Sequence, residues 1–405
     1  MYLTHLSITD FRNISRLDKD IPCGSLLFVG ANAQGKTSLL EAIYFLATMT
    51  SFRADSDRPL LNLFAARQPL AVARIVAIYS QGGNSHQIEV RLIQEANGFN
   101  TIPKIRKEVL LDGLKRKIKE VIGQFTAVLF SPQMISVIEG VPDERRRYLN
   151  LTLAQVLPRY ASALSDYTQT LTQRNALLKQ LNERNGDNNQ LDFWDECLAS
   201  AGSRLIYARI HSIQEIEDLA APIHKELTRQ SGILRLSYHP AYEPLPAPTG
   251  QFILPLSIPK NRSGISEDQI RQGFLEKLAR QRVEEIARGV TTIGPHRDEL
   301  RFLENGIDLG IYGSRGQVRT AMLSLKLAEV MWMREKKNGE PPVLLLDEML
   351  AELDSERRTD LLNRLSVAEQ TMLTTTDLDL FSMEFINRAN IWDLHGGEVK
   401  ARGFV

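Results

Sequence analysis

The sequence predicts an α/β fold built from both ends of the chain, with a helical subdomain inserted between them. Three observations lead to this prediction. Near the amino end, a glycine-rich loop at 30–37 follows a short apolar run and precedes a helical pattern. Near the carboxyl end, an apolar run at 343–346 is closed by two carboxylates. Between them, apolar residues recur every three or four positions from 143 onward, as in long helices.

The first 120 or so residues are expected to be rich in strands. Alternating apolar and polar residues at 2–8, 71–78 and 87–92 are typical of half-buried strands. Asp112-Gly113 is a strong turn dipeptide between 109–111 and the residues from Leu114 onward. These segments therefore predict hairpin strands on either side of the glycine-rich loop.

The glycine-rich loop has the pattern of a phosphate-binding loop. Its residues match G-x-x-x-x-G-K-[ST] and are Gly30, Ala31, Asn32, Ala33, Gln34, Gly35, Lys36 and Thr37. The glycines let backbone N–H groups turn toward phosphate oxygens, Lys36 can reach the β- and γ-phosphates, and the Thr37 hydroxyl can ligate Mg²⁺. A chance glycine turn is the alternative, but the strand expected at 25–29 and the helix expected at 38–46 supply the context that the motif requires.

The carboxylates at 347–348 complement this loop. Pro341-Pro342 precedes the apolar run 343–346, which is too short for a helix and predicts a buried strand. Asp347 then stands at the carboxyl end of a strand, where α/β sheets bind ligands, and is expected to hold the Mg²⁺ shell. Glu348 is expected to orient the attacking water. An acidic strand end is weak evidence by itself, but with a phosphate loop it indicates an ATPase.

A second anion-binding geometry is expected at Ser314-Arg315-Gly316-Gln317, which precedes a helical pattern at 318–333. A serine and a glycine at a helix start can bind phosphate through free N–H groups. Because one nucleotide does not need two such sites in one chain, Ser314, Gly316 and Gln317 are expected to contact ATP held by a second subunit. An ordinary serine N-cap would explain the same residues.

The middle of the chain predicts a helical hairpin. The pattern that begins at 143 is interrupted by a polar segment at 182–189 and resumes at 194–219, and a proline-rich stretch at 240–259 predicts an extended crossing. We therefore expect a head built from 1–122 and 288–405 and a helical arm at 123–287. A plain helical core without further function is the alternative.

The amino-acid composition limits the class of protein and its cellular location. Hydrophobic residues make up 43% of the chain and charged residues 24%, values that are ordinary for globular proteins. No apolar run approaches the roughly 18 residues of a membrane span, which argues against an integral transporter. Only Cys23 and Cys197 are present, so a reducing, cytoplasmic location is expected.

Charge gives only local support for nucleic-acid binding. The 49 basic residues are balanced by 49 acidic ones. Basic clusters occur at 104–107, 115–119 and 145–147, and each has a solvated surface as its simplest explanation. We expect DNA contacts in the second cluster, at Lys115, Arg116, Lys117 and Lys119.

Beyond these motifs, the chain resembles the ATP-binding-cassette heads of transporters and SMC ATPases and, more narrowly, the bacterial RecF family. The stretches that carry the narrower resemblance are 10–13, 171–179, 292–298, 312–329, 345–354 and 374–377. The resemblance covers essentially the whole chain, and Gly-Pro-His-Arg-Asp at 294–298 is far more specific than the phosphate loop.

The resemblance implies a nucleoid-associated DNA-repair protein of the SOS response. Proteins of this family bind ATP and Mg²⁺, dimerise, engage DNA at single-strand gaps and junctions, and act with RecO and RecR to load RecA. Slow, DNA-stimulated ATP hydrolysis would reset the clamp. In family terms, 30–37 correspond to Walker A, Asp347-Glu348 to Walker B and 314–317 to the signature motif. Asp354, with Ser314, corresponds to the dimer interface.

Three features depart from the family pattern or leave alternatives open. Many family members have Asp-Asp where this chain has Asp347-Glu348, and Thr376-Asp377 stands where other cassettes have a switch histidine. Gln133 is expected to bridge Mg²⁺ and water, with Gln124 as the alternative. The rival functions are the ATPase subunit of a transporter, disfavoured by the long insert, and the head of an SMC-like nuclease complex.

Overall fold

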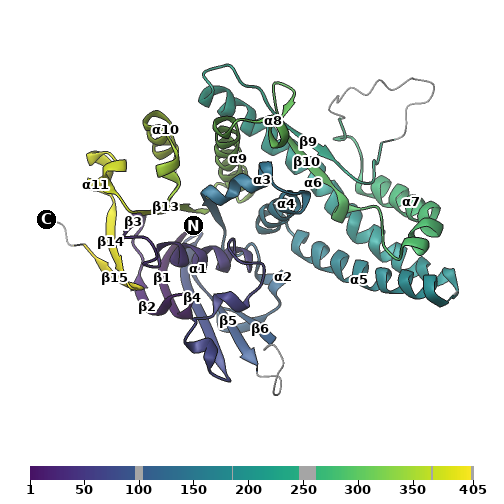
Figure 1. Ribbon diagram of the computed structural model, residues 1–405, viewed down its shortest axis with the longest axis horizontal. Coiled ribbons are helices and arrows are strands. Elements are labelled where there is room, and N and C mark those ends of the chain that lie inside the picture. The colour runs from purple at the N-terminus through teal and green to yellow at the C-terminus, as the bar shows by residue number, and fades with distance from the viewer. Residues whose placement is uncertain (96–103, 185, 246–260, 366–367, 403–405) are drawn as a thin grey trace. The chain divides into compact units, whose positions relative to one another are not determined.

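The computed structural model describes residues 1–95, 104–184, 186–245, 261–365 and 368–402 (Figure 1). The chain divides into two compact units. Met1–Met134 and Glu329–Val405 form the first, here called the sheet unit, and Ile135–Ala328 form the second, the helical unit. Both chain ends thus fold together, although the boundaries differ from those predicted at 122 and 288.

The first sheet of the sheet unit is antiparallel. Its strands lie in the order β2-β1-β4-β5-β6-β7 and are β1 (Tyr2–Phe11), β2 (Ile14–Asp20), β4 (Ala71–Gln81), β5 (Asn84–Glu95), β6 (Lys104–Leu111) and β7 (Leu114–Arg116). Asp112 and Gly113 join β6 to β7 with φ values of 50° and 78°, as a tight hairpin turn requires. The strands predicted at 2–8, 71–78 and 87–92 are confirmed.

The second sheet holds both chain ends together. Its strands lie in the order β15-β14-β3-β13-β12-β8 and are β3 (Gly24–Val29), β8 (Ala127–Phe130), β12 (Val343–Asp347), β13 (Gln370–Thr375), β14 (Asn390–His395) and β15 (Glu398–Ala401). Every pairing except that of β15 is parallel. Because β8 pairs with β12, the sheet unit extends past the boundary predicted at 122.

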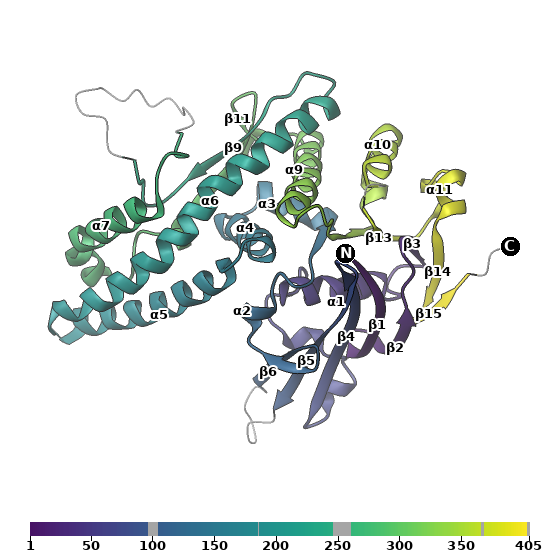
Figure 2. The ribbon, with the colours of Figure 1, turned by 180° about the vertical axis from the view of Figure 1, so that it is seen from behind.

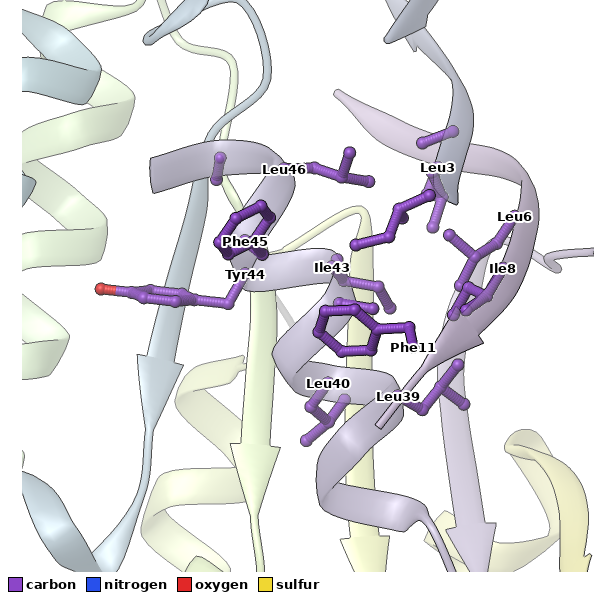
Figure 3. Close-up of a cluster of buried hydrophobic side chains, with 14 of the residues drawn as sticks. Leu3, Leu6, Ile8, Phe11, Leu39, Leu40, Ile43, Tyr44, Phe45 and Leu46 are labelled. Atoms are coloured by element: carbon purple, nitrogen blue, oxygen red, sulfur yellow. The ribbon is translucent and has the colours of Figure 1, made fainter. Parts of the chain in front are cut away.

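Helix α1 (Lys36–Thr48) forms the centre of the sheet unit's core. Nearly all its side chains are buried, because it contacts strands of both sheets. Figure 3 shows side chains of β1, among them Leu3, Leu6 and Phe11, gathered with those of α1. A helix buried on all sides is held by packing over its whole surface, so the loop that precedes it has a fixed position. The unit also contains α2 (Ile118–Val121), α10 (Ser355–Leu365) and α11 (Met383–Arg388).

The helical unit contains the predicted hairpin. Its helices are α3 (Ser136–Glu139), α4 (Pro142–Val156), α5 (Tyr160–Arg184), α6 (Leu191–Leu227) and α7 (Glu267–Arg288), and α5, α6 and α7 lie side by side (Figures 1 and 2). The first limb is divided in two, because Pro158 cannot continue the hydrogen-bonding of α4. The predicted crossing at 240–259 falls mostly outside the described residues. No helix among the described residues combines the length and hydropathy of a membrane span.

A small antiparallel sheet completes the helical unit. Its strands, β9 (Leu234–His239), β10 (Glu299–Glu304) and β11 (Ile307–Asp308), lie in the order β11-β10-β9. It leads into α8 (Leu309–Tyr312) and α9 (Arg315–Lys336). Strand β10 pairs along its whole length with β9, so residues 299–308 belong to the helical unit. The predicted boundary at 288 had placed them in the head.

Buried charges fasten the 291–298 segment to the helices. The guanidinium of Arg174, fully buried on α5, binds Asp195 at 2.6 Å, Glu285 at 2.7 Å and the Thr291 hydroxyl at 2.7 Å. Arg209 of α6 donates to Asp298 at 2.6 Å and to the carbonyl of Pro295 at 2.7 Å. The specific stretches at 171–179 and 292–298 are therefore explained by a structural junction.

His296 belongs to this junction. Its Nδ1 lies 2.7 Å from the Tyr167 hydroxyl and its Nε2 3.1 Å from the Thr291 carbonyl. Burial lowers the pKa of His296 to about 4, so the ring is neutral at physiological pH. Nε2–H donates to the carbonyl and Nδ1 accepts from the tyrosine, which gives His296 a structural role.

Removing Asp298 should strongly destabilise the helical unit. Asp298 also accepts hydrogen bonds from the Tyr238 hydroxyl and from Ala241 N–H, and it is 1% exposed. Asp298→Ala would leave the Arg209 charge buried without its partner, at a cost of about 3–5 kcal/mol in the free energy of unfolding. Urea denaturation followed by circular dichroism measures the change.

The matched control is Glu284→Ala, which removes an exposed ion pair with Arg288 on α7. That change should cost less than about 1 kcal/mol. Equal losses for the two variants would contradict the structural role given to Asp298.

Candidate nucleotide-binding site

The loop at 30–37 runs from the end of β3 to the first turn of α1, and its glycines stand where side chains do not fit. A Cβ on Gly30 would lie 2.5 Å from the Leu394 carbonyl oxygen of β14. Gly35 has φ of 105°, which favours glycine, and Ala33 adopts φ of 65°. The predicted phosphate loop therefore has its required strand–loop–helix setting, with the N-terminal N–H groups of a buried helix at its end.

Lys36 lies between the loop and Glu348. Its ammonium donates to the carbonyls of Gly30 at 2.7 Å and Ala31 at 3.0 Å, and it lies 3.1 Å from a carboxylate oxygen of Glu348. The Lys36 side chain is 3% exposed, whereas that of Glu348 is 42% exposed. The structure thus brings together two of the predicted catalytic residues, with one of them open to solvent.

Asp347 joins the two chain ends. One of its carboxylate oxygens accepts hydrogen bonds from the hydroxyl of Thr37 at 2.8 Å and from that of Thr374 at 2.9 Å. Thr374 faces Asp347 in the β12–β13 register, and its hydroxyl also accepts the Glu348 N–H at 2.9 Å. Thr374 lies in the 374–377 stretch that carries the family resemblance, but the sequence assigned it no role at the site, because a threonine within a strand gives no signal of its partner.

Electrostatics at Asp347 reflect opposing effects. Burial raises the pKa of Asp347, whereas the hydroxyl donors Thr37 and Thr374 lower it, and the adjacent Glu348 charge raises it. Glu348 itself adopts φ of 51°, an uncommon backbone conformation for a non-glycine residue. Its N–H bond to Thr374 holds this turn in place.

The oxygen ligands present suit Mg²⁺ better than a transition metal. The described residues contain no group of three or more His, Cys, Asp and Glu side chains that could hold a metal by themselves. Thr37 and Asp347 instead offer hard oxygens beside a phosphate loop, as Mg²⁺ sites completed by phosphates and water do. Gln133 follows β8 at the carboxyl edge of the sheet, whereas Gln124 precedes β8. This topology favours Gln133.

A pocket of about 1070 Å³ extends from the loop across the residues that follow α1. Its wall includes Phe64 and Leu63, which are 72% and 66% exposed. The Arg67 guanidinium lies 5.6 Å from the centre of the Phe64 ring. The remaining wall includes Arg12, Asn13, Arg53 and Arg58. Sequence reasoning missed Phe64, because only the folded chain brings this segment to the phosphate loop.

The Ser314 turn lies at the start of α9 in the helical unit, and residues 314–317 are exposed. The Ser314 hydroxyl accepts the Gln317 N–H at 3.3 Å, and Gln317 Oε1 accepts the Ser314 N–H at 3.0 Å. The serine N-cap that was the alternative explanation for these residues is therefore present. Because Gln317 Nε2 also donates to Glu304 at 2.7 Å, the Gln317 amide is engaged inside its own chain.

Among the remaining predicted residues, Asp354 and Lys115 have local partners. Asp354 accepts the Arg357 N–H at 2.9 Å at the start of α10, which is an ordinary N-cap role. Lys115 pairs with Glu108 at 2.7 Å, so its charge is partly offset. Arg116 and Lys117 are exposed on β7 and just after it. Whether these residues reach a partner subunit or DNA stays a prediction.

A phosphate loop and paired carboxylates at the edge of one parallel sheet define a P-loop nucleotide-binding protein. The family model described as the RecF/RecN/SMC N terminal domain matches residues 2–385. The chain is 40% identical to the DNA replication and repair protein RecF of Roseiflexus castenholzii, covering 98% of this chain and 99% of that one. It is 38% identical to that of Chloroflexus aurantiacus, covering 99% and 100%. The chain belongs to the RecF family of DNA replication and repair proteins.

Solved structures agree with this assignment. The recombination mediator protein RecF with ATP, of the RecFOR pathway, is 28% identical with a TM-score of 0.83, covering 99% of this chain and 98% of that one. The Smc head of Pyrococcus furiosus, 17% identical with a TM-score of 0.51 and covering 100% and 96%, shares the fold. The expected α/β head with a helical arm is thereby confirmed.

Replacing Thr374 by valine tests the hydroxyl shared between β12 and β13. Thr374→Val preserves shape but removes a donor to Asp347, so we expect a loss of about 1–3 kcal/mol in the free energy of unfolding. It should also raise the pKa of Asp347 further. A carboxyl whose folded pKa lies above its unfolded value loses stability as pH rises through the folded pKa, so the loss should be larger at pH 7.5 than near pH 4.

The control is Thr371→Val, the same change in the same buried strand. Unfolding free energies of both variants, measured without nucleotide across this pH range, separate the effects. A deficit of Thr374→Val that did not vary with pH would show that Asp347 is not the group affected.

Proposed function

We propose that this protein is an ATP-driven, dimerising DNA clamp of recombinational repair. The observation that carries the proposal is the convergence at one sheet edge of Thr37 with Asp347 and of Lys36 with Glu348. A metal ligand pair, a phosphate-binding cation and an exposed carboxylate are the groups that ATP hydrolysis needs. Membership of the RecF family supports DNA repair as the setting.

ATP would lie with its phosphates on residues 30–37. Thr37 and Asp347, with Gln133, would hold Mg²⁺, which supplies charge neutralisation at the phosphates when bound. The pocket beyond the loop is wide enough for the nucleoside, and Phe64 offers an exposed ring face for base stacking. The solved RecF structure with ATP supports the choice of nucleotide.

Glu348 would orient and polarise the attacking water. Its solvent exposure gives water access, and its contact with Lys36 keeps the carboxylate beside the cation that would bind the β- and γ-phosphates. The strained turn at Glu348 fixes the direction of this side chain. Hydrolysis would be slow and DNA-stimulated, so that it times the reopening of the clamp.

Dimerisation would complete the site. The exposed N-terminal turn of α9 would present the Ser314 hydroxyl and the Gly316 N–H to a γ-phosphate bound by the partner subunit, while the Gln317 N–H closes the turn on Ser314. Asp354 would lie at the same interface. ATP binding then stabilises the dimer, and the dimer tightens ATP binding to the same extent.

Family membership also supports the proposed partners. The clamp would bind DNA at single-strand gaps and junctions and, with RecO and RecR, promote RecA loading in the cytoplasm, close to the nucleoid. The similarity spans both chain ends and the insert, which favours repair over the ATPase subunit of a transporter or the head of an SMC-like nuclease complex.

Sedimentation tests the composite site. With Mg²⁺ and ATP, Glu348→Gln should form a stable dimer, because binding persists while hydrolysis falls by about 10²-fold or more. Adding Ser314→Arg should return the protein to monomer and leave ATP binding to the monomer intact. Analytical ultracentrifugation and fluorescent-nucleotide titration give the two readings. A dimer without ATP, or unchanged turnover in Glu348→Gln, would contradict the mechanism.

Charge reversal tests the DNA surface. Arg116→Glu with Lys117→Glu should weaken binding to a gapped duplex and flatten the dependence of affinity on salt, because phosphate contacts release counterions. The control reverses Lys277 and Arg280 on α7. Fluorescence anisotropy at several salt concentrations measures both. Equal affinity of the 116–117 variant and the wild type would remove this cluster from the DNA surface.

A further inference from the structure

We infer that Glu304 and His224 are positioning residues for the Ser314 turn, and that through them the arm helix α6 sets the contact with the partner's nucleotide. This inference rests on the proposed role of Ser314 in a composite site. Neither residue belongs to the phosphate loop, to the carboxylates or to any motif singled out in the sequence. All residues concerned lie within the helical unit.

Glu304 fixes the orientation of the Gln317 side chain. Gln317 Oε1 accepts the Ser314 N–H at 3.0 Å, and Gln317 Nε2 donates to Glu304 Oε2 at 2.7 Å. A carboxylate can only accept hydrogen bonds. If the Gln317 amide were flipped, its oxygen would face the Glu304 carboxylate and its NH₂ group would face the Ser314 N–H, and both hydrogen bonds would be lost. The Glu304 carboxylate therefore selects the one amide orientation that holds the Ser314 backbone.

His224 fixes Glu304 in turn. Its Nε2 lies 3.1 Å from Glu304 Oε1, and its Nδ1 lies 3.1 Å from the Ser324 hydroxyl. That hydroxyl also lies 2.8 Å from the Thr320 carbonyl. Because a carboxylate can only accept, His224 Nε2–H donates to Glu304 and fixes the position of its carboxylate.

The pair is shielded from solvent. His224 is 0% exposed and Glu304 is 6% exposed. A Cβ on Gly232 would lie 2.6 Å from Glu304 Oε1 and 2.9 Å from His224 Nε2, so the backbone passes directly over the pair. Charge-assisted hydrogen bonds are strong in such surroundings, and their geometry is tightly constrained.

The network links three elements. His224 lies in the last turn of α6, Glu304 ends β10, and Gln317 lies in the first turn of α9. Helix α6 is 37 residues long and forms one limb of the helical hairpin. A displacement of α6 moves His224, and with it the carboxylate that orients Gln317. Helix α6 therefore contributes, through His224 and Glu304, to the position of the Ser314 turn.

The central test is Glu304→Gln in a Glu348→Gln background. The new amide is isosteric but no longer requires the same orientation of Gln317. The dimer dissociation constant with Mg²⁺ and ATP, measured by ultracentrifugation, should rise about tenfold, as for loss of one charge-assisted hydrogen bond. ATP affinity of the monomer should be unchanged. The matched control is Glu217→Gln, which makes the same change at a buried glutamate on α6 that is bound to Arg235 and to the Leu236 N–H.

A double-mutant cycle and a rescue distinguish positioning from a loss of folding. If Glu304 acts through Ser314, Glu304→Gln should add nothing in a Ser314→Ala background. Gln317→Glu combined with Glu304→Gln should restore the dimer, because the carboxylate at 317 can accept from both Ser314 N–H and the amide at 304. The rescue also keeps the test valid if Glu304→Gln alone folds poorly.

The outcomes separate two failures. If Ser314→Ala leaves ATP-dependent dimerisation unchanged, the proposed composite site itself is wrong. If Ser314→Ala weakens the dimer while Glu304→Gln does not, or if the two effects add fully or the rescue fails, the positioning role is overturned.

Discussion

The sheet unit depends on one constraint, the parallel register of β3, β13 and β12. Parallel neighbours end at the same edge, so residues separated by about three hundred positions in the chain meet there. The Asp347 carboxylate links these segments directly, because it accepts hydrogen bonds from the hydroxyls of Thr37 on α1 and Thr374 on β13. Without that register, the phosphate loop and the carboxylates would be unrelated motifs.

In the helical unit, distant segments are held together by buried ion pairs, whereas in the sheet unit they are held together by the register of parallel strands. Arg174 of α5 donates to the Thr291 hydroxyl, and Arg209 of α6 donates to Asp298. The carboxylates that pair with these two arginines are almost fully buried. Buried pairs contribute geometry more reliably than stability, because desolvation offsets much of their attraction. The buried His224–Glu304 pair likewise contributes geometry, because it orients the Ser314 turn, whose proposed contact with a phosphate needs a defined position.

Much of the fold could be predicted from local pattern. Alternation identified the strands of the first sheet, and the strand before Gly30 and the helix after Thr37 were found where the motif required them. The boundaries of the inserted region were less accurate. Strand β8 is only four residues long, and β9 and β10 lie about sixty residues apart in the chain, so their membership depends on pairing partners and not on their own composition.

The sequence by itself determined which residues make up the candidate site, because glycine, lysine, threonine and paired carboxylates have few alternative uses at those spacings. It also determined family membership through stretches that turned out to be mostly structural. Only the tertiary structure decided which side chains serve those residues. Thr374, Phe64, Glu304 and His224 are ordinary in sequence, and each acquires its role from a neighbour contributed by another element. The physical reason is that hydrogen bonds and buried charges act over a few ångströms, between residues that the chain itself keeps far apart.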